Sequence, residues 1–155
     1  MAEYQFDSDI SECLFSYFPF YFISYSNATH RIRYIYISYN KNKGSYELYL
    51  VLRAQDNLFS LTLVSGNVIK RCSNPPRFRV VVLNEVADFI RKGRNVFARH
   101  VINVDKELRA GDEVIVTDEN DNLLAVGKMK LSGEEILTYK KGVAVEVKKG
   151  AYNER

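Results

Sequence analysis

Apolar and polar residues alternate in short runs along this chain of 155 residues, and turn residues separate the runs. Before Pro19 the apolar residues recur at helical spacing, and Ser8 or Asp9 is placed to cap the helix that this spacing predicts. Runs rich in aromatic and β-branched residues then predict strands. These strands are expected at residues 20–25, 31–39 and 46–52, with a turn at residues 40–44. The pattern indicates a small α+β unit, with helices on one face of an antiparallel sheet.

Residues 58–71 fit two patterns, a strand followed by a turn or a single helix. The inward residues of such a helix would be Leu58, Leu61, Leu63, Val64 and Val68. Gly66 weakens the helical interpretation, because glycine lowers helix stability by about 1 kcal/mol relative to alanine. The pattern alone leaves both interpretations open.

Residues 79–83 predict a continuous apolar strand, and residues 84–92 predict a helix that Asn84 caps. The inward residues of this helix are expected to be Val86, Phe89 and Ile90. Gly93 follows, at the position where a left-handed residue ends a helix. Apolar and polar residues then roughly alternate, which predicts a strand from Arg94 to Val101.

The remaining residues predict a compact β-barrel built from short strands. A polar hairpin turn at residues 118–122 joins two of the strands, and Gly127 is expected to mark a bulge or bend. A short helix that Gly142 caps precedes the last strand, in which Glu146 points outward. The strands are expected at residues 114–117, 123–130 and 143–147, and the helix at residues 134–141.

A Ser-Asn-Pro-Pro stretch at residues 73–76 interrupts the pattern as a short linker does. We therefore expect two domains, residues 1–74 and residues 75–155. Fifteen of the 20 aromatic residues precede Pro75. Aromatic residues in a domain without tryptophan are expected to fill a core or a partner interface rather than to stack on bases.

The net charge of +3 comes from 22 basic and 19 acidic residues. The part before Pro75 has seven basic and six acidic residues, and the rest has 15 and 13. The electrostatic field of the whole molecule is therefore weak. Binding of a polyanion would depend on a local group of cations.

Cys13 and Cys72 are the two cysteines, and no histidine lies at metal-ligand spacing from them, so no metal site is expected. Reduced thiols are the simpler expectation, with a disulfide between the two as the alternative. The acidic start of the chain lacks the positive leader of a secretory signal. The apolar run at residues 18–25 is far shorter than the roughly 20 residues that cross a bilayer. We therefore expect a soluble cytoplasmic protein.

Two predicted helices end in a pair of cations and a glycine that runs into a strand. These endings are Arg91-Lys92-Gly93 and Lys140-Lys141-Gly142. Cations in the last turn stabilise a helix dipole, so either ending alone indicates only helix termination. Both together, with Arg94 and Arg99 beside the first, favour a polyanion partner.

Three stretches carry a family resemblance. They are RVVVLNEVADFIRKGRNVFARHV, LRAGDEVIVTDENDNLLAVGKMKLS and LTYKKGVAVEVKKG. In this order they resemble a PUA domain, a small RNA-binding barrel, over residues 77–150. The likeness is closest to the C-terminal end of archaeosine tRNA-guanine transglycosylase, and it extends back through residues 58–71, where that family favours a helix.

In the PUA family, the helix, the strand after it and the last strand form the face that contacts RNA. The resemblance therefore implies that the glycine turns let backbone N–H groups approach a phosphate, while arginine can bind it bidentately. The implied RNA-binding residues are Arg91, Lys92, Gly93, Arg94, Asn95, Arg99, Lys140, Lys141, Gly142, Lys148 and Lys149.

No pattern of catalytic residues is found, and neither a cofactor nor a small-molecule substrate is expected. His30 and His100 are isolated, and the carboxylates of residues 118–122 fit turn chemistry better than a calcium loop. No glycine-rich nucleotide fingerprint is present. Transglycosylase chemistry belongs to a barrel of about 250 residues. We therefore do not expect an enzyme.

Three functions are weighed. The resemblance favours an RNA-binding module, with tRNA as its partner, or a separate tRNA-binding subunit that assists a catalytic transglycosylase chain in archaeosine modification. The alternative is a ribosome-assembly or translation-associated factor with a PUA tail. A complete small enzyme would need an acid and a base that the sequence does not offer. Candidate contacts with a catalytic partner are Tyr34, Tyr36 and Tyr39.

Overall fold

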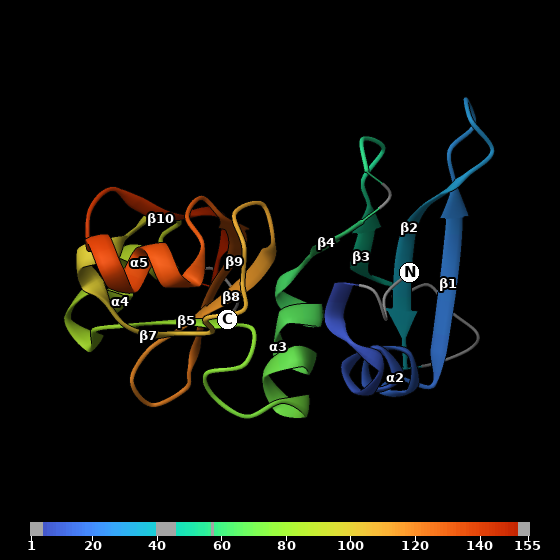
Figure 1. The fold of residues 1–155 in the computed structure, drawn as a ribbon. Helices are drawn as coiled ribbons and strands as arrows, with labels where there is room; N and C mark the ends of the chain where they lie inside the picture. The colour runs from blue at the N-terminus through green and yellow to red at the C-terminus, as the bar shows by residue number, and fades with distance from the viewer. Residues whose placement is uncertain (1–4, 40–45, 57, 152–155) are drawn as a thin grey trace. The chain divides into compact units, whose positions relative to one another are not determined.

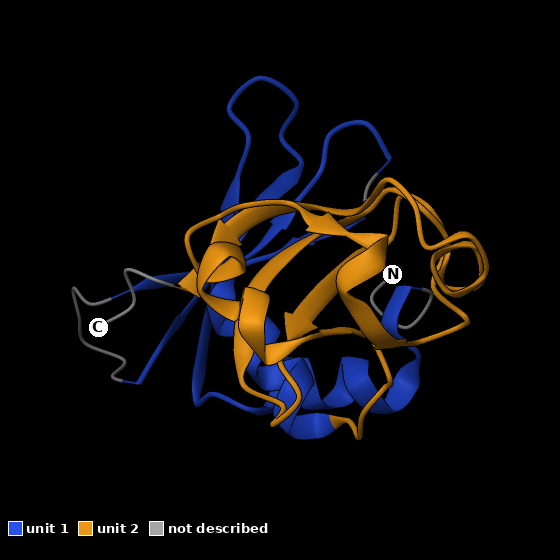
Figure 2. Ribbon diagram, turned by 90° about the vertical axis from the view of Figure 1, so that its left-hand side faces the viewer, with its two compact units in different colours: residues 1–72 blue, residues 73–155 orange. Residues whose placement is uncertain are grey.

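The structure is a computed structural model that describes residues 5–39, 46–56 and 58–151. The chain divides into two compact units, residues 1–72 and residues 73–155 (Figure 2). Within the described residues, no helix is long and apolar enough to span a membrane.

The first unit is a four-stranded antiparallel sheet with the helices α2 and α3 (Figure 1). Its strands follow one another in the sheet in their order along the chain, β1-β2-β3-β4. The elements are α2 Ser8–Ser16, β1 Phe20–Tyr25, β2 Ile32–Ser38, β3 Glu47–Leu52, β4 Phe59–Leu61 and α3 Leu63–Cys72. The three strands expected before residue 58 are therefore confirmed, whereas the turn expected at residues 40–44 lies outside the described residues.

Two predictions for this unit need correction. The cap of α2 is Asp7, whose Oδ1 accepts a hydrogen bond from the Ile10 N–H at 3.3 Å, rather than Ser8 or Asp9. The helix begins one residue earlier than expected, which leaves Ser8 within its first turn. Residues 58–71 contain a strand and a helix in succession, because Thr62 and Ser65 exchange hydrogen bonds where β4 ends and α3 begins.

Aromatic residues fill the space between the helices and the sheet. Tyr49 is fully buried, and its hydroxyl donates to the Leu14 carbonyl of α2 at 2.8 Å. The Tyr21 hydroxyl donates to the same carbonyl at 2.7 Å and accepts from the Phe18 N–H. Burial raises the pKa of both tyrosines, so they stay protonated and act as hydrogen-bond donors. The aromatic sequence of this unit therefore serves its core in large part.

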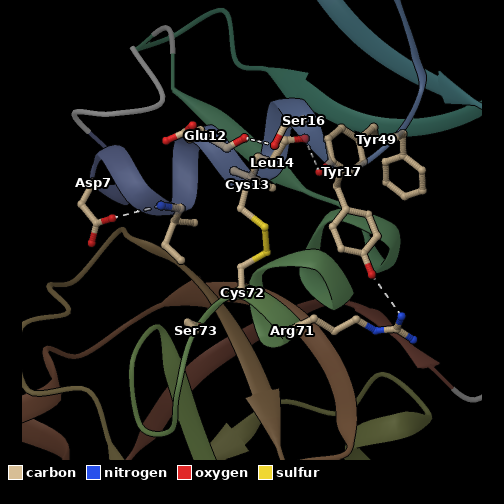
Figure 3. Close-up of a disulfide and its surroundings, with 12 residues drawn as sticks. Asp7, Glu12, Cys13, Leu14, Ser16, Tyr17, Tyr49, Arg71, Cys72 and Ser73 are labelled. Carbon is tan, nitrogen blue, oxygen red and sulfur yellow. Dashed lines mark hydrogen bonds between the residues drawn. A yellow bond between two sulfur atoms is a disulfide. The ribbon is translucent and has the colours of Figure 1, made fainter.

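A disulfide joins Cys13 of α2 to Cys72 at the end of α3 (Figure 3). The expectation of reduced thiols is therefore wrong for this structure. The two helices pack against each other, which brings the two Cα atoms to 6.4 Å, within the range that a disulfide bridges. Beside it, the Arg71 guanidinium donates to the Tyr17 hydroxyl at 3.1 Å and forms a second link between the helices.

The second unit is a six-stranded, nearly closed barrel with strand order β6-β10-β9-β8-β5-β7. Its strands are β5 Arg79–Val82, β6 Val96–Phe97, β7 Val101–Val104, β8 Glu113–Thr117, β9 Leu123–Met129 and β10 Val143–Gly150. Its helical segments are η1 Asn84–Val86, α4 Ala87–Arg91, η2 Ala98–His100 and α5 Gly133–Tyr139. The strands pair antiparallel except β5 with β8. The predicted α+β class with a PUA-type barrel is confirmed.

A buried arginine links the start of this unit to its hairpin turn. Arg79 has no exposed surface, and its guanidinium bonds to Asp121 through Nε at 2.7 Å and Nη2 at 3.2 Å. Nη1 donates to the Ser73 hydroxyl at 2.9 Å. A guanidinium out of water requires such partners for its donors, so the segment at Ser73 is structurally part of the barrel.

Several local predictions for the second unit are wrong. Asn84 does not cap α4, because its side chain accepts a hydrogen bond from the Glu119 N–H instead. Phe89 was expected to point inward but is 59% exposed, because the 3₁₀ turn η1 before α4 shifts the phase of the helix. The strand expected from Arg94 to Val101 is split by η2, a 3₁₀ turn. The bulge or bend expected at Gly127 lies instead on the neighbouring strand β10, between Val147 and Lys149. Glycine is needed at residue 127 because a Cβ there would collide with the Glu146 carbonyl.

A chain that begins at Ser73 and ends at Arg155 should fold by itself, because Ser73 completes the hydrogen bonds of buried Arg79. Circular dichroism and amide exchange should show a cooperatively folded β-rich domain. A polypeptide without protected amides would contradict this expectation, and with it the assignment of residues 73–155 as an autonomous domain.

Replacing both cysteines, Cys13→Ser with Cys72→Ser, should lower the unfolding free energy of the first unit by about 2–4 kcal/mol. The link joins residues 59 apart in sequence, so its loss frees a long loop in the unfolded state. Denaturant unfolding with and without a reductant measures the effect, and the double variant should not respond to reductant. Equal stability of the oxidised and reduced wild type would contradict the expectation.

Candidate nucleic-acid interface

The turn from α4 to β6 ends the helix with a glycine in the left-handed region. Gly93 has φ 97°, its N–H donates to the Ile90 carbonyl at 2.9 Å, and the Arg94 N–H donates to the Phe89 carbonyl at 3.1 Å. These two bonds form a Schellman motif. The prediction that Gly93 ends the helix as a left-handed residue is therefore confirmed, and the motif fixes the backbone that carries Arg91, Lys92 and Arg94.

The end of β10 lies against this turn. The Asn95 Oδ1 accepts a hydrogen bond from the Val147 N–H at 3.0 Å. Gly150 packs so closely on the backbone of Arg91 and Gly93 that a Cβ would collide with both. Lys148 and Lys149 are thereby brought beside the turn. We name this group the α4–β6 cluster: Arg91, Lys92, Gly93, Arg94, Asn95, Lys148 and Lys149.

The turn from α5 to β10 has a different geometry from the one expected. A capping box of Ser132 and Glu135 begins the helix, and Lys140, with φ 53°, is the left-handed residue that ends it. Gly142 has φ 80° but follows the cap, so its predicted role as the cap is wrong. Its carbonyl accepts from the Ala98 N–H at 2.9 Å, next to Arg99. We name this group the α5–β10 cluster: Arg99, Lys140, Lys141 and Gly142.

The two clusters lie at opposite ends of the β6–β10 pair. Phe97 pairs with Val143 and Val96 pairs with Val145. Because the strands are antiparallel, the residues before Val96 approach Val147, and the residues after Phe97 approach Gly142. Five residues of extended strand span about 17 Å. The predicted residues therefore lie along one edge of the barrel sheet as two separate groups.

Lys148 and Arg91 have ion-pair partners within the fold. The Lys148 Nζ lies 3.1 Å from the Oε2 of Glu113, a carboxylate with no exposed surface. The Arg91 Nη1 lies 3.3 Å from the Oδ1 of Asp88, and its Nη2 lies 3.8 Å from the Oδ2 of Asp118. Removing either cation would leave a carboxylate without that partner. The exposed basic residues of the two clusters are Lys92, Arg94, Arg99, Lys140, Lys141, Lys148 and Lys149.

Two exposed aromatic side chains join these clusters, and sequence reasoning missed both. Phe97 is 44% exposed, with the Arg99 guanidinium 5.7 Å from its ring centre and His100 at 6.4 Å. Tyr139, which precedes Lys140, is 67% exposed. Such rings can stack on unpaired bases. In the sequence, only their position next to cations indicated that these two rings are exposed. That position is also compatible with a buried aromatic residue in a strand, so it did not identify them.

The hairpin turn at residues 118–122 has the predicted turn chemistry. The Asp118 Oδ1 accepts from the N–H groups of Asn120 and Asn122, both at 2.9 Å. Burial acts to raise the pKa of Asp118, but these bonds, the Asn122 amide and the Arg91 charge outweigh it and hold the pKa below its usual range. Across the described part of the chain, no three His, Cys, Asp or Glu side chains are grouped to hold a metal ion.

Both units match known domain families. Residues 1–76 match the patch-forming domain C2 of tRNA-guanine transglycosylase, and residues 78–151 match the PUA domain.

Relatives over most of the chain include two tRNA-guanine(15) transglycosylases. That of Methanococcus aeolicus is 41% identical over 83% of this chain, and that of Thermococcus kodakarensis is 37% identical over 97%. The chain spans 19% and 24% of their lengths, at their C-terminal ends. A hypothetical protein of Pyrococcus horikoshii has a similar fold, with a TM-score of 0.67 at 19% identity, covering 98% of this chain and 86% of that one.

Charge reversal in both clusters, Arg94→Glu with Lys141→Glu, should weaken RNA binding by similar factors across RNA sequences. Phosphate contacts release counterions, so the slope of log K against log salt should fall by about 0.7 to 0.9 per lost contact. Fluorescence anisotropy over a salt series measures both quantities. The matched control is Lys106→Glu with Arg109→Glu, which reverses two exposed cations outside the clusters. Unchanged affinity and slope in the first variant would show that the face is wrongly assigned.

Proposed function

We propose that this chain binds tRNA and serves tRNA guanine exchange as a non-catalytic module. Its two domains match the patch-forming domain C2 of tRNA-guanine transglycosylase and the PUA domain. The observation that carries the proposal is the pair of exposed basic clusters at the two ends of β10, on a domain of RNA-binding type. Arginine and backbone N–H groups at such turns suit the phosphates of a folded RNA.

The two domains correspond to the C-terminal 19–24% of two relatives, so the other three quarters or more of those proteins lie outside this similarity. We propose that a catalytic transglycosylase chain supplies that part. Exchange of a base requires its extrusion into a deep pocket with placed catalytic groups, whereas holding a folded RNA requires only a charged platform. Binding energy from such a remote platform can orient the reacting nucleotide.

The proposed contact with the catalytic chain is the aromatic surface of the first unit. Tyr34 and Tyr36 lie on β2, and Tyr36 pairs with Phe22 of β1 and Leu48 of β3. Cross-strand partners share one face of a sheet, and these side chains carry no charge. Tyr39 is 73% exposed, and its ring lies 5.4 Å from the ring of Phe18, which in turn contacts buried Tyr49. An uncharged aromatic face suits a protein surface better than a polyanion.

The test is exchange of labelled guanine into tRNA by this protein alone, by a transglycosylase that lacks its own C2 and PUA domains, and by the two together. We expect no exchange by this protein alone and a lower KM for tRNA when both are present. The Arg94→Glu, Lys141→Glu variant should lose that gain, while the Lys106→Glu, Arg109→Glu control should keep it.

Exchange by this protein alone would overturn the non-catalytic assignment. If the protein binds tRNA but does not change the partner's kinetics, the transglycosylation role is wrong, and a ribosome-assembly or translation-associated role is favoured instead.

A further inference from the structure

A basic pocket lies at one end of the first unit's sheet, remote in sequence from both basic clusters. The β1–β2 turn and the β3–β4 turn emerge at this end (Figure 1). A cavity of about 300 Å³ lies here, and its charged and hydroxyl lining residues are Ser26, Thr29, Arg31, Arg33 and Arg53. Three of the seven basic residues before Pro75 therefore line a single cavity.

Hydrogen bonds hold the walls of this pocket in place. The Ser26 N–H donates to the Arg31 carbonyl at 2.7 Å, and the His30 N–H donates to the Ser26 carbonyl at 2.8 Å. On the other wall, the Arg53 N–H donates to the Leu58 carbonyl at 2.8 Å. Both turns are thus closed by backbone bonds, so the pocket does not depend on a ligand to assemble it.

Two of the three guanidinium groups are oriented by contacts within the unit. The Arg33 Nη1 donates to the Leu52 carbonyl at 3.0 Å. Arg53 forms an ion pair with Asp56, with Nη2 2.9 Å from Oδ2. The Arg31 side chain is exposed. Three cations against one carboxylate leave the pocket positive.

We propose that this pocket binds a phosphodiester of the RNA, as a second backbone contact on the C2 domain. The inference rests on the proposed RNA-binding function and adds to it a contact outside the PUA domain. Fixed guanidinium donors beside two hydroxyls match the oxygen atoms of a phosphate, because arginine donates in a planar fork. Both walls are exposed turns, which a continuous RNA strand can reach.

The test uses Arg31→Ala in the full chain, because Arg33 and Arg53 bond within the fold whereas Arg31 projects into solvent. Binding to a tRNA transcript should weaken by about two- to tenfold, and the salt slope should fall by about 0.7 to 0.9. The control is Arg71→Ala, an exposed arginine of the same unit outside the pocket that bonds to the Tyr17 hydroxyl; with its fold checked by circular dichroism, it should bind as the wild type does. Arg31→Lys should keep most of the salt slope, because it retains the charge.

A titration with inorganic phosphate, followed by the arginine Nε–H NMR signals, tests the pocket without RNA. Phosphate should shift the signals of Arg31 and Arg33 in the wild type, and the Arg33 shift should be lost in Arg31→Ala. Absence of these shifts would overturn the pocket, whatever the RNA result.

Comparison of the variants separates this inference from the proposed function. If Arg94→Glu, Lys141→Glu weakens tRNA binding but Arg31→Ala does not, the second contact is wrong and the proposed function stands. If the wild type binds phosphate in the pocket but does not bind tRNA, the proposed function is wrong, and the RNA contact inferred here falls with it.

Discussion

The backbone pairing of β10 is the constraint on which the candidate site depends. This strand pairs with β9 on one side and with β6 on the other, and its last glycine packs on the backbone that ends α4. The same strand begins at the second basic turn. A displacement of β10 would therefore move both clusters at once. The α4–β6 cluster is held in place for the same reason, since its turn is fixed by the Schellman motif of Gly93 and by the Asn95 side chain.

The charge of the protein is arranged locally rather than globally. A net charge of +3 gives little long-range attraction for RNA, and part of the positive charge is used inside the fold, as in the pairs of Arg79 with Asp121 and Lys148 with Glu113. What remains exposed is grouped at turns. Binding by a few grouped cations responds to the position of each phosphate, whereas a uniformly basic surface does not.

Sequence reasoning recovered the elements that have a strong local cause. Gly93 was assigned correctly because a left-handed helix end favours glycine, and the strands of the first unit because aromatic and β-branched residues are dense there. It failed where distant residues compete for the same group. Asn84 has good capping chemistry, but it bonds to Glu119, which is 35 residues away. Cys13 and Cys72 are likewise brought together by helix packing, which spacing alone does not reveal.

For the site, sequence reasoning identified the residue types but not their grouping in space. The endings Arg91-Lys92-Gly93 and Lys140-Lys141-Gly142 look alike in sequence. The left-handed residue that ends the helix is Gly93 in the first and Lys140 in the second. Lysine is disfavoured in that conformation, but the turn it forms lets the Gly142 carbonyl accept the Ala98 N–H at the start of η2. Two turns that are similar in sequence thus present their cations differently. The turn of the α4–β6 cluster is held against β10 by Asn95 and Gly150, while the cations of the α5–β10 cluster follow a left-handed lysine, so the proposed RNA would meet two distinct contacts along one sheet edge.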